Sequence, residues 1–276
     1  MLLYPGVGLT EGSGGISTGT KMRAFAIRQS YHLALWLLLF ILNSSLLSQP
    51  SGYAHRKLIT LNSLQISGAT DHTNFPVMVK LTEADLKSTT NGGGVVSPSG
   101  YDILFTQSDG STLLNHELQN YSATSGDLLC WVNLPALSPT VDSDIYLYYG
   151  KSGIYTDQSD TLTWNSNYLG VWHMEDLSDA AGTYTLTDHN TAANASGYLG
   201  SAREFDGDGD DLEDLKGGSY LNGLGAFTIS VWAKANALGT DKGLIYGVDP
   251  DGLDRRLMIR QDAAGEKGVA PMCFEP

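Results

Sequence analysis

Residues 128–134 read LLCWVNL and residues 145–149 read IYLYY, and these two stretches decide the fold class. In each stretch, aliphatic or small side chains alternate with large aromatic or polar ones. The positions that share one face are Leu128, Cys130, Val132 and Leu134 in the first stretch, and Ile145, Leu147 and Tyr149 in the second. A period of two residues is typical of a β-strand that turns one face toward a core. Both stretches are therefore predicted strands.

The same short alternation recurs outward along the chain, and no long helical period interrupts it. Phe75, Val77, Val79 and Leu81 share one face of a further predicted strand. Pro76 in this strand cannot donate a ladder hydrogen bond, which favours an edge strand or a strand that begins there. Clusters such as 91–94 (NGGG) and 109–110 (DG) indicate turns between the strands. The pattern predicts an all-β fold of the sandwich or barrel type.

The chain divides into two predicted β-sandwich modules. Residues 52–154 form the first, polar residues 155–168 form a linker, and residues 169–276 form the second. Strands expected in the second module are 169–173, 202–205, 227–233, 244–248 and 256–259.

Residues 22–48 have the plan of an export signal. Arg23 and Arg28 precede the apolar run 33–42 (LALWLLLFIL), and small or polar residues follow it. The run is about half the length that a membrane-spanning helix needs, so a cleaved signal helix is favoured over an anchor. No stable membrane insertion is expected after its removal. Residues 1–21 lack these features and are interpreted as a spurious upstream extension, with translation starting at Met22.

The balance of charge narrows the set of partners. The formal net charge is −14, and it becomes more negative once residues 1–48 are removed. So acidic a surface repels phosphate backbones, which argues against nucleic-acid binding. Carboxylates are also the ligands that calcium prefers. Of the two cysteines, Cys130 alternates with apolar residues and is expected to be a small buried side chain.

A set of short motifs falls in order along the first module. They are 55–59 (HRKLI), 74–77 (NFPV), 101–105 (YDILF), 109–110 (DG), 129–135 (LCWVNLP) and 145–150 (IYLYYG). Together they resemble the bacterial domain of unknown function 2341 over residues 53–154. This family has no settled activity, so the resemblance implies architecture and little about function.

Motifs in the second module resemble a laminin-G-like, concanavalin-A-type jelly roll. They are 170–175 (GVWHME), 200–207 (GSAREFDG) and 227–232 (FTISVW). The module is expected to be incomplete, because only residues 169–276 are present and 268–276 have no strand pattern. The resemblance implies a secreted or cell-envelope protein that takes part in adhesion or glycan recognition, often with calcium at the sandwich rim.

Candidate ligands for calcium are concentrated in one acidic loop. Asp206, Asp208, Asp210 and Asp211 alternate with glycine in 206–211 (DGDGDD), and Glu175 is a further candidate at the rim. Several oxygens on a flexible loop suit calcium, although a solvated turn has the same composition. His173 and Glu175 lie two residues apart and would share a strand face. The pair fits a zinc or acid–base site, but the sequence places no third partner, so a histidine that is only hydrogen-bonded is favoured.

The sequence carries no catalytic pattern, so no catalytic residues are assigned. Residues 49–276 contain neither paired carboxylates on a strand nor a GxSxG nucleophile turn; the one GxSxG match, 15–19 (GISTG), lies in the upstream extension. The aromatic residues Trp131, Tyr146, Tyr148 and Trp232 alternate away from the aliphatic faces, and they either stack on sugars or pack under a loop or a neighbouring domain. The expected function is binding of an extracellular glycan or a surface protein. The alternatives are a structural spacer of a larger envelope protein and the non-catalytic front end of a secreted carbohydrate-active enzyme.

Overall fold

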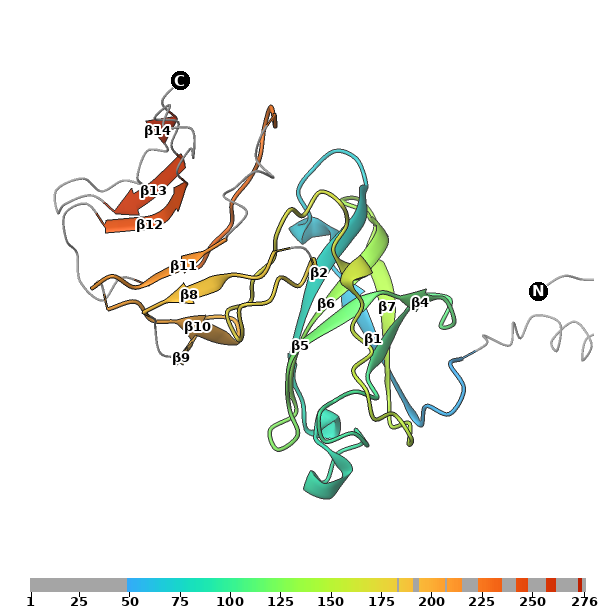
Figure 1. The fold of residues 1–276 in the computed structure, drawn as a ribbon. Helices are drawn as coiled ribbons and strands as arrows, with labels where there is room; N and C mark the ends of the chain where they lie inside the picture. Colours follow the sequence, from blue (N-terminus) through green and yellow to red (C-terminus); the bar gives the residue numbers. More distant parts are fainter. Residues whose placement is uncertain are drawn as a thin grey trace, which may run out of the picture. The chain divides into compact units, whose positions relative to one another are not determined.

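A computed structural model describes residues 49–182, 184–190, 194–206, 208–214, 223–234, 242–247, 257–261 and 273–274. The expected extension 1–21 and signal helix 22–48 lie outside these ranges. Within them the chain is built from short strands and single 3-10 turns, as Figure 1 shows, so the all-β prediction is confirmed. None of the helices in the described part is long and apolar enough to cross a membrane.

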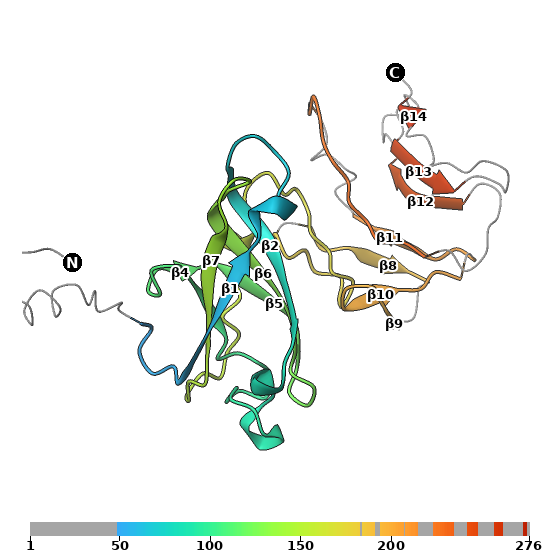
Figure 2. The same cartoon turned by 180° about the vertical axis from the view of Figure 1, so that it is seen from behind.

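Two antiparallel sheets form a sandwich from the first seven strands. One sheet has the order β1-β7-β3-β4 and the other has the order β2-β6-β5. The strands are β1 His55–Leu61, β2 His72–Thr82, β3 Leu104–Gln107, β4 Leu113–Leu114, β5 His116–Ser122, β6 Asp127–Leu137 and β7 Ser143–Tyr149. Four 3-10 turns accompany them: η1 Ser63–Gln65, η2 Ala84–Leu86, η3 Thr89–Asn91 and η4 Thr161–Thr163. Figures 1 and 2 show the two sheets from opposite sides.

The core lies between the two sheets, where the predicted inner faces meet. Leu128, Cys130 and Val132 of β6 are fully buried, and so are Phe105 of β3 and Leu147 of β7. The prediction for Cys130 is confirmed: its thiol is free and buried, and burial raises its pKa well above the usual value. Such a thiol is a poor nucleophile, so it acts as a core side chain.

Strand β2 lies at the edge of its sheet, as Pro76 predicts. Among the described strands it pairs only with β6, in a register that sets Val77 opposite Val132 and Pro76 opposite Asn133. The missing N–H of proline is tolerated at an edge because no second strand needs it. The strand begins at His72, ahead of Pro76, so the alternative that it begins at the proline is wrong.

Asp102 connects the loop before β3 to the end of β7. Its fully buried carboxyl group accepts hydrogen bonds from the backbone N–H groups of Val96 (2.9 Å), Ser97 (2.8 Å) and Gly150 (2.8 Å). Buried backbone donors need partners, and this one side chain satisfies three of them. The motifs 101–105 and 145–150 are therefore in direct contact.

The later described residues form two small antiparallel strand pairs and one three-stranded antiparallel sheet. The strands are β8 Thr187–His189 with β11 Asp211–Glu213, β9 Asn194–Ser196 with β10 Ser201–Arg203, and β12 Lys242–Gly247 with β13 Leu257–Gln261 and β14 Cys273–Phe274. Strands β10, β12 and β13 fall at the predicted positions.

Two other predicted strands are wrong. Residues 169–173 form no strand, because the Val171 N–H donates to the Asp179 carboxylate at 2.8 Å and Met174 takes a positive φ of 65°. A side chain that binds a backbone N–H removes it from any ladder. Residues 227–233 also form no strand, although Phe227 and Ile229 are half-buried as the alternation predicts. Alternation alone does not make a strand, since a strand also needs pairing.

Candidate functional site

The outer face of the sheet β2-β6-β5 is covered by the chain that follows the sandwich. We call residues 157–173 the covering segment. Ser159 accepts a hydrogen bond from the Leu118 N–H at 2.9 Å, and the Asp160 N–H donates to His116 O at 2.9 Å. Further along, the Thr163 carbonyl accepts from the Asn133 side-chain amide at 2.9 Å. The residues expected to form a linker thus include several that bind the edge and face of this sheet.

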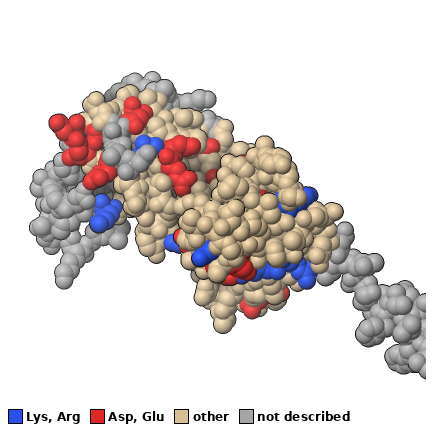
Figure 3. Space-filling model, turned by 90° about the horizontal axis from the view of Figure 1, so that it is seen from below, with Lys and Arg blue, Asp and Glu red and all other residues tan. Residues whose placement is uncertain are grey.

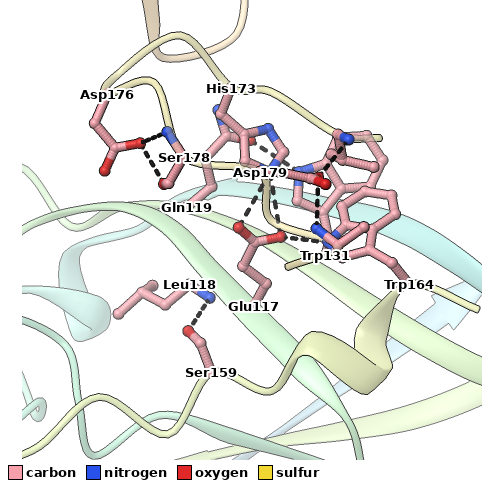
Figure 4. Close-up of polar contacts among 12 residues, drawn as sticks. Glu117, Leu118, Gln119, Trp131, Ser159, Trp164, His173, Asp176, Ser178 and Asp179 are labelled. Atoms are coloured by element: carbon pink, nitrogen blue, oxygen red, sulfur yellow. Dashed lines mark hydrogen bonds and ion pairs between the residues drawn. The ribbon is translucent and has the colours of Figure 1, made fainter. Parts of the chain in front are cut away.

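Glu117 of β5 is the polar centre of the covered face. Its carboxylate accepts a hydrogen bond from the Trp164 indole N–H at 2.7 Å and lies 3.1 Å from His173 Nε2. Figure 4 shows both partners converging on the carboxylate. The side chains of Glu117 and His173 are only 17% and 16% exposed. Such a carboxylate and imidazole are chemically suited to proton transfer, but here they also tie the covering segment to β5.

Aromatic rings surround this centre. Trp131 packs against Trp164 with ring centroids 5.1 Å apart and stacks on His173 at 6.1 Å. The Trp131 indole N–H donates to Gln119 Oε1 at 2.8 Å, and Tyr168 contacts Trp164 edge-on at 5.1 Å. Burying indoles with satisfied N–H groups is favourable both through apolar area and through aromatic contact. Of the two roles expected for Trp131, the structure therefore favours packing against a later part of the chain and not stacking on a sugar.

The loop that carries His173 is held by Asp179. The Asp179 carboxylate accepts from the backbone N–H groups of Val171 (2.8 Å), Ala181 (2.9 Å) and Tyr184 (3.0 Å). The Trp172 indole N–H donates to the Tyr184 carbonyl at 2.7 Å. These contacts hold residues 171–182 and Tyr184 in a compact loop and orient His173 toward Glu117. Sequence alone missed Glu117, because nothing in its local pattern marks it.

Glu175 lies beside this centre and not on a shared strand face with His173. A Cβ atom added at Gly200, which has a φ of 67°, would lie 2.9 Å from Glu175 Oε1 and 3.0 Å from Gln119 Nε2. The pKa of Glu175 is raised, mainly by burial. The nearby His173 opposes this rise, and the carboxylates of Asp176 and Glu117 add to it. The prediction of a common strand face is wrong, but the two side chains are neighbours.

The acidic loop is held by contacts among its own residues. The Asp206 N–H donates to Asp210 Oδ2 at 2.8 Å, and the Asp208 N–H donates to Asp206 Oδ1 at 2.7 Å. Asp211 begins β11 opposite His189, and Gly207 lies outside the described residues. In the described part of the chain, no three His, Cys, Asp or Glu side chains are grouped as a metal site. Calcium binding by Asp206, Asp208, Asp210, Asp211 and Glu175 stays a prediction.

The remaining aromatic candidates separate into packed and exposed residues. The Tyr148 ring is buried and its hydroxyl donates to Gly110 O at 3.0 Å, while the Arg56 guanidinium lies over Tyr146 at 4.5 Å. Trp232 is 70% exposed and packs against Tyr198, also 70% exposed, with ring centroids 4.4 Å apart and planes at 30°. Tyr198 was not singled out from the sequence. Its place between Gly197 and Gly200, at a turn that closes with the Gly197 N–H on Gly200 O, could have marked it.

A small cavity of about 200 Å³ opens beside β3 and β4. Phe105, His116 and Asp160 line it together with neighbouring residues. His116 packs edge-on against Phe105 at 5.4 Å, and burial lowers its pKa.

Comparison with known proteins finds one matching family model. Searches of curated proteins and of solved structures each found no match to the chain. A family model described as "Domain of unknown function (DUF2341)" matches residues 99–189. The matched range starts after the motifs 55–59 and 74–77, and it continues past residue 154 through the covering segment and the Asp179 loop to the end of β8. Residues 99–189 of this chain are thus similar to the domain of unknown function 2341.

Proposed function

We propose that this chain belongs to a secreted or cell-surface protein, binds an extracellular glycan and has no catalysis of its own. The observation that carries the proposal is the exposed pair Tyr198 and Trp232. Contiguous exposed apolar groups on a folded surface often mark a binding site. The flat C–H face of a sugar ring fits an aromatic ring, and indole and phenol groups add hydrogen bonds at its edge.

The neighbouring features are consistent with a binding role. The Tyr198 turn follows β9 and leads into β10, so one aromatic side chain of the pair is placed by a short hairpin. Sites on rigid elements hold their groups more precisely than sites on long loops, which lowers the entropy cost of binding. Export through residues 22–48 and a laminin-G-like identity for the later residues are further parts of the proposal, and they rest on the sequence motifs.

A glycan array tests this proposal on the full chain, with three single variants alongside. We expect Trp232→Ala and Tyr198→Ala each to reduce glycan binding at least tenfold. Tyr155→Ala is the matched control, because Tyr155 is 86% exposed and lies outside the pair. Absence of binding to every glycan, or equal binding by all variants, would refute the proposal.

Calcium binding is tested separately, by thermal melting with and without a chelator. The proposal includes calcium at residues 206–211, with Glu175 as a further ligand. A chelator is then expected to lower the melting temperature of the wild-type chain, and Asp206→Asn with Asp210→Asn is expected to remove that sensitivity. An unchanged melting curve with and without chelator would exclude calcium.

The second candidate function is a structural spacer, and the Glu117 centre favours it. A face covered by two indoles and a carboxylate–imidazole contact connects the sandwich firmly to the segment that follows it. A spacer needs such rigid connections and no ligand. The array separates the two candidates, since a spacer predicts no specific glycan and no effect of Trp232→Ala.

A further inference from the structure

A lysine of the first sandwich lies next to the exposed aromatic pair. Lys80 Nζ of β2 lies 6.0 Å from the centroid of the Tyr198 ring, and that ring packs against Trp232. The three side chains come from an edge strand, from the turn between β9 and β10, and from residues 223–234. One surface therefore combines two stacking groups with one positive charge.

The Lys80 ammonium has unused hydrogen-bond capacity. Lys57, by comparison, forms ion pairs with both Glu83 and Asp85. Among the described residues, no carboxylate lies within 4.0 Å of Lys80 Nζ. Asp127 is the nearby acid whose pKa the lysine helps to lower, but its oxygens already accept hydrogen bonds from Ser125 and Thr82.

The contact between Lys80 and Tyr198 is also loose. A distance of 6.0 Å is at the outer limit of a cation–π interaction, so the ring holds the ammonium only weakly. Lysine carries three rotatable N–H donors on a flexible stem and can turn them to a ligand beside the ring. The exposed side chain is thus free to follow a group on a bound sugar.

From this arrangement we propose that the pair Tyr198 and Trp232 binds an acidic sugar, whose carboxylate or sulfate group pairs with Lys80. This inference rests on the proposed glycan-binding function and names its ligand class. The aromatic rings contact the apolar face of the sugar, and the ammonium donates to its anionic group.

Electrostatics then selects acidic sugars over neutral ones. A neutral sugar that covers Lys80 removes water from the ammonium and supplies no charged partner, which is unfavourable. An acidic sugar replaces that water with a charge-assisted hydrogen bond, about twice as strong as a neutral one. The chain has 16 Lys and Arg against 30 Asp and Glu, so Lys80 is one of a minority of charged groups that attract anions. Figure 3 shows several separate groups of acidic side chains on the face drawn.

The test compares charged and uncharged forms of the same sugar on the full chain. Tetragalacturonic acid is titrated beside its fully methyl-esterified form, and dextran sulfate oligosaccharide beside dextran. We expect the wild type to bind at least one acidic member at least tenfold more tightly than its neutral counterpart. Which pair shows the difference distinguishes a carboxylate from a sulfate.

Substitutions separate this inference from the function it rests on. Lys80→Gln is expected to weaken acidic-sugar binding about tenfold and to leave binding of the neutral forms undiminished or slightly tighter, while Lys80→Arg retains binding of the acidic forms. Lys151→Gln is the control, because Lys151 lies over Tyr53 at 5.1 Å and away from the pair. Equal affinity for charged and neutral forms, or no effect of Lys80→Gln, overturns the acidic-sugar inference and leaves glycan binding intact. Undiminished sugar binding by Trp232→Ala overturns both.

Discussion

Replacement of Asp102 by asparagine tests whether this side chain holds the first sandwich together. Its two carboxyl oxygens serve three backbone donors: Oδ2 accepts from Val96 and Gly150, and Oδ1 accepts from Ser97. Asparagine has the same shape but only one oxygen, and its amide nitrogen donates instead of accepting. The side chain fits without a cavity, so the change isolates hydrogen bonding.

The expected loss follows from counting donors. With its oxygen in the place of Oδ2, the asparagine side chain would keep the bonds to Val96 and Gly150, and it would set an amide N–H against the Ser97 N–H. One buried hydrogen bond is lost and a buried donor is left unsatisfied, which costs about 1–3 kcal/mol, and the donor–donor contact adds to it. The other orientation loses two bonds. We therefore expect Asp102→Asn to lower the free energy of unfolding by about 3 kcal/mol.

Denaturant unfolding gives the global cost, and hydrogen exchange localises it. The amide protons of Val96, Ser97 and Gly150 should exchange faster in the variant, while those in the middle of β6 should change only with global stability. Asp142→Asn is the matched control, since Asp142 accepts from the Ser63 N–H and hydroxyl at an exposed site, and a smaller change is expected there. A loss below about 0.5 kcal/mol, or unchanged exchange at all three amides, would refute the reasoning.

Three further predictions concern the covered face and the cavity beside it. Burial lowers the pKa of His116 below its usual 6.5, so the unfolded chain binds a proton at this histidine at a higher pH than the folded chain does. The free energy of unfolding should therefore fall as the pH drops from about 7 to 5. In melting curves, His116→Gln should reduce this dependence of the melting temperature on pH. The Thr163 hydroxyl is buried without a hydrogen-bond partner. Thr163→Val should therefore leave the free energy of unfolding unchanged or raise it by about 1 kcal/mol. A decrease in the free energy of unfolding by more than about 1 kcal/mol would contradict this expectation. A fragment of residues 49–154 should have a lower melting temperature than a fragment of residues 49–190. Its Trp131 fluorescence should also be quenched more readily by acrylamide, because Trp164 no longer covers the ring. Equal melting temperatures would contradict the role of the covering segment.

The strands of the first sandwich could be predicted because their pattern is local. In β6 the inner positions Cys130 and Val132 alternate with Trp131, and the period of two residues is visible within one short stretch. The edge position of β2 followed from Pro76 for the same reason, since a missing N–H has the same consequence in any sheet. The predicted strand 169–173 failed because a side chain took over a backbone hydrogen bond, as Asp179 does at Val171.

The candidate sites could be predicted only in part, because their members are far apart in the chain. Trp232 was a candidate, but its partner Tyr198 was not, and no local period connects a turn residue to a tryptophan 34 positions later. Glu117 and His173 are separated by 56 residues and meet only because the covering segment returns to β5. Lys80 belongs to a strand whose pattern indicates only burial and exposure, so its place beside the aromatic pair required the tertiary structure.

Polar composition alone does not show whether a segment connects two modules or forms part of one. Residues 157–165 read DQSDTLTWN, and in solution such side chains would be hydrated. Here Ser159 accepts from β5, and Asn165 donates to the Asn74 carbonyl at 2.6 Å. The segment thus satisfies backbone groups at the edge of β5 and on β2, while Trp164 covers Trp131 on β6. A sheet with Trp131 and Leu129 on its outer face needs such a cover, because exposed apolar strands promote aggregation. The family match, residues 99–189, includes the whole covering segment together with β5 and β6, while β2 lies ahead of the matched range.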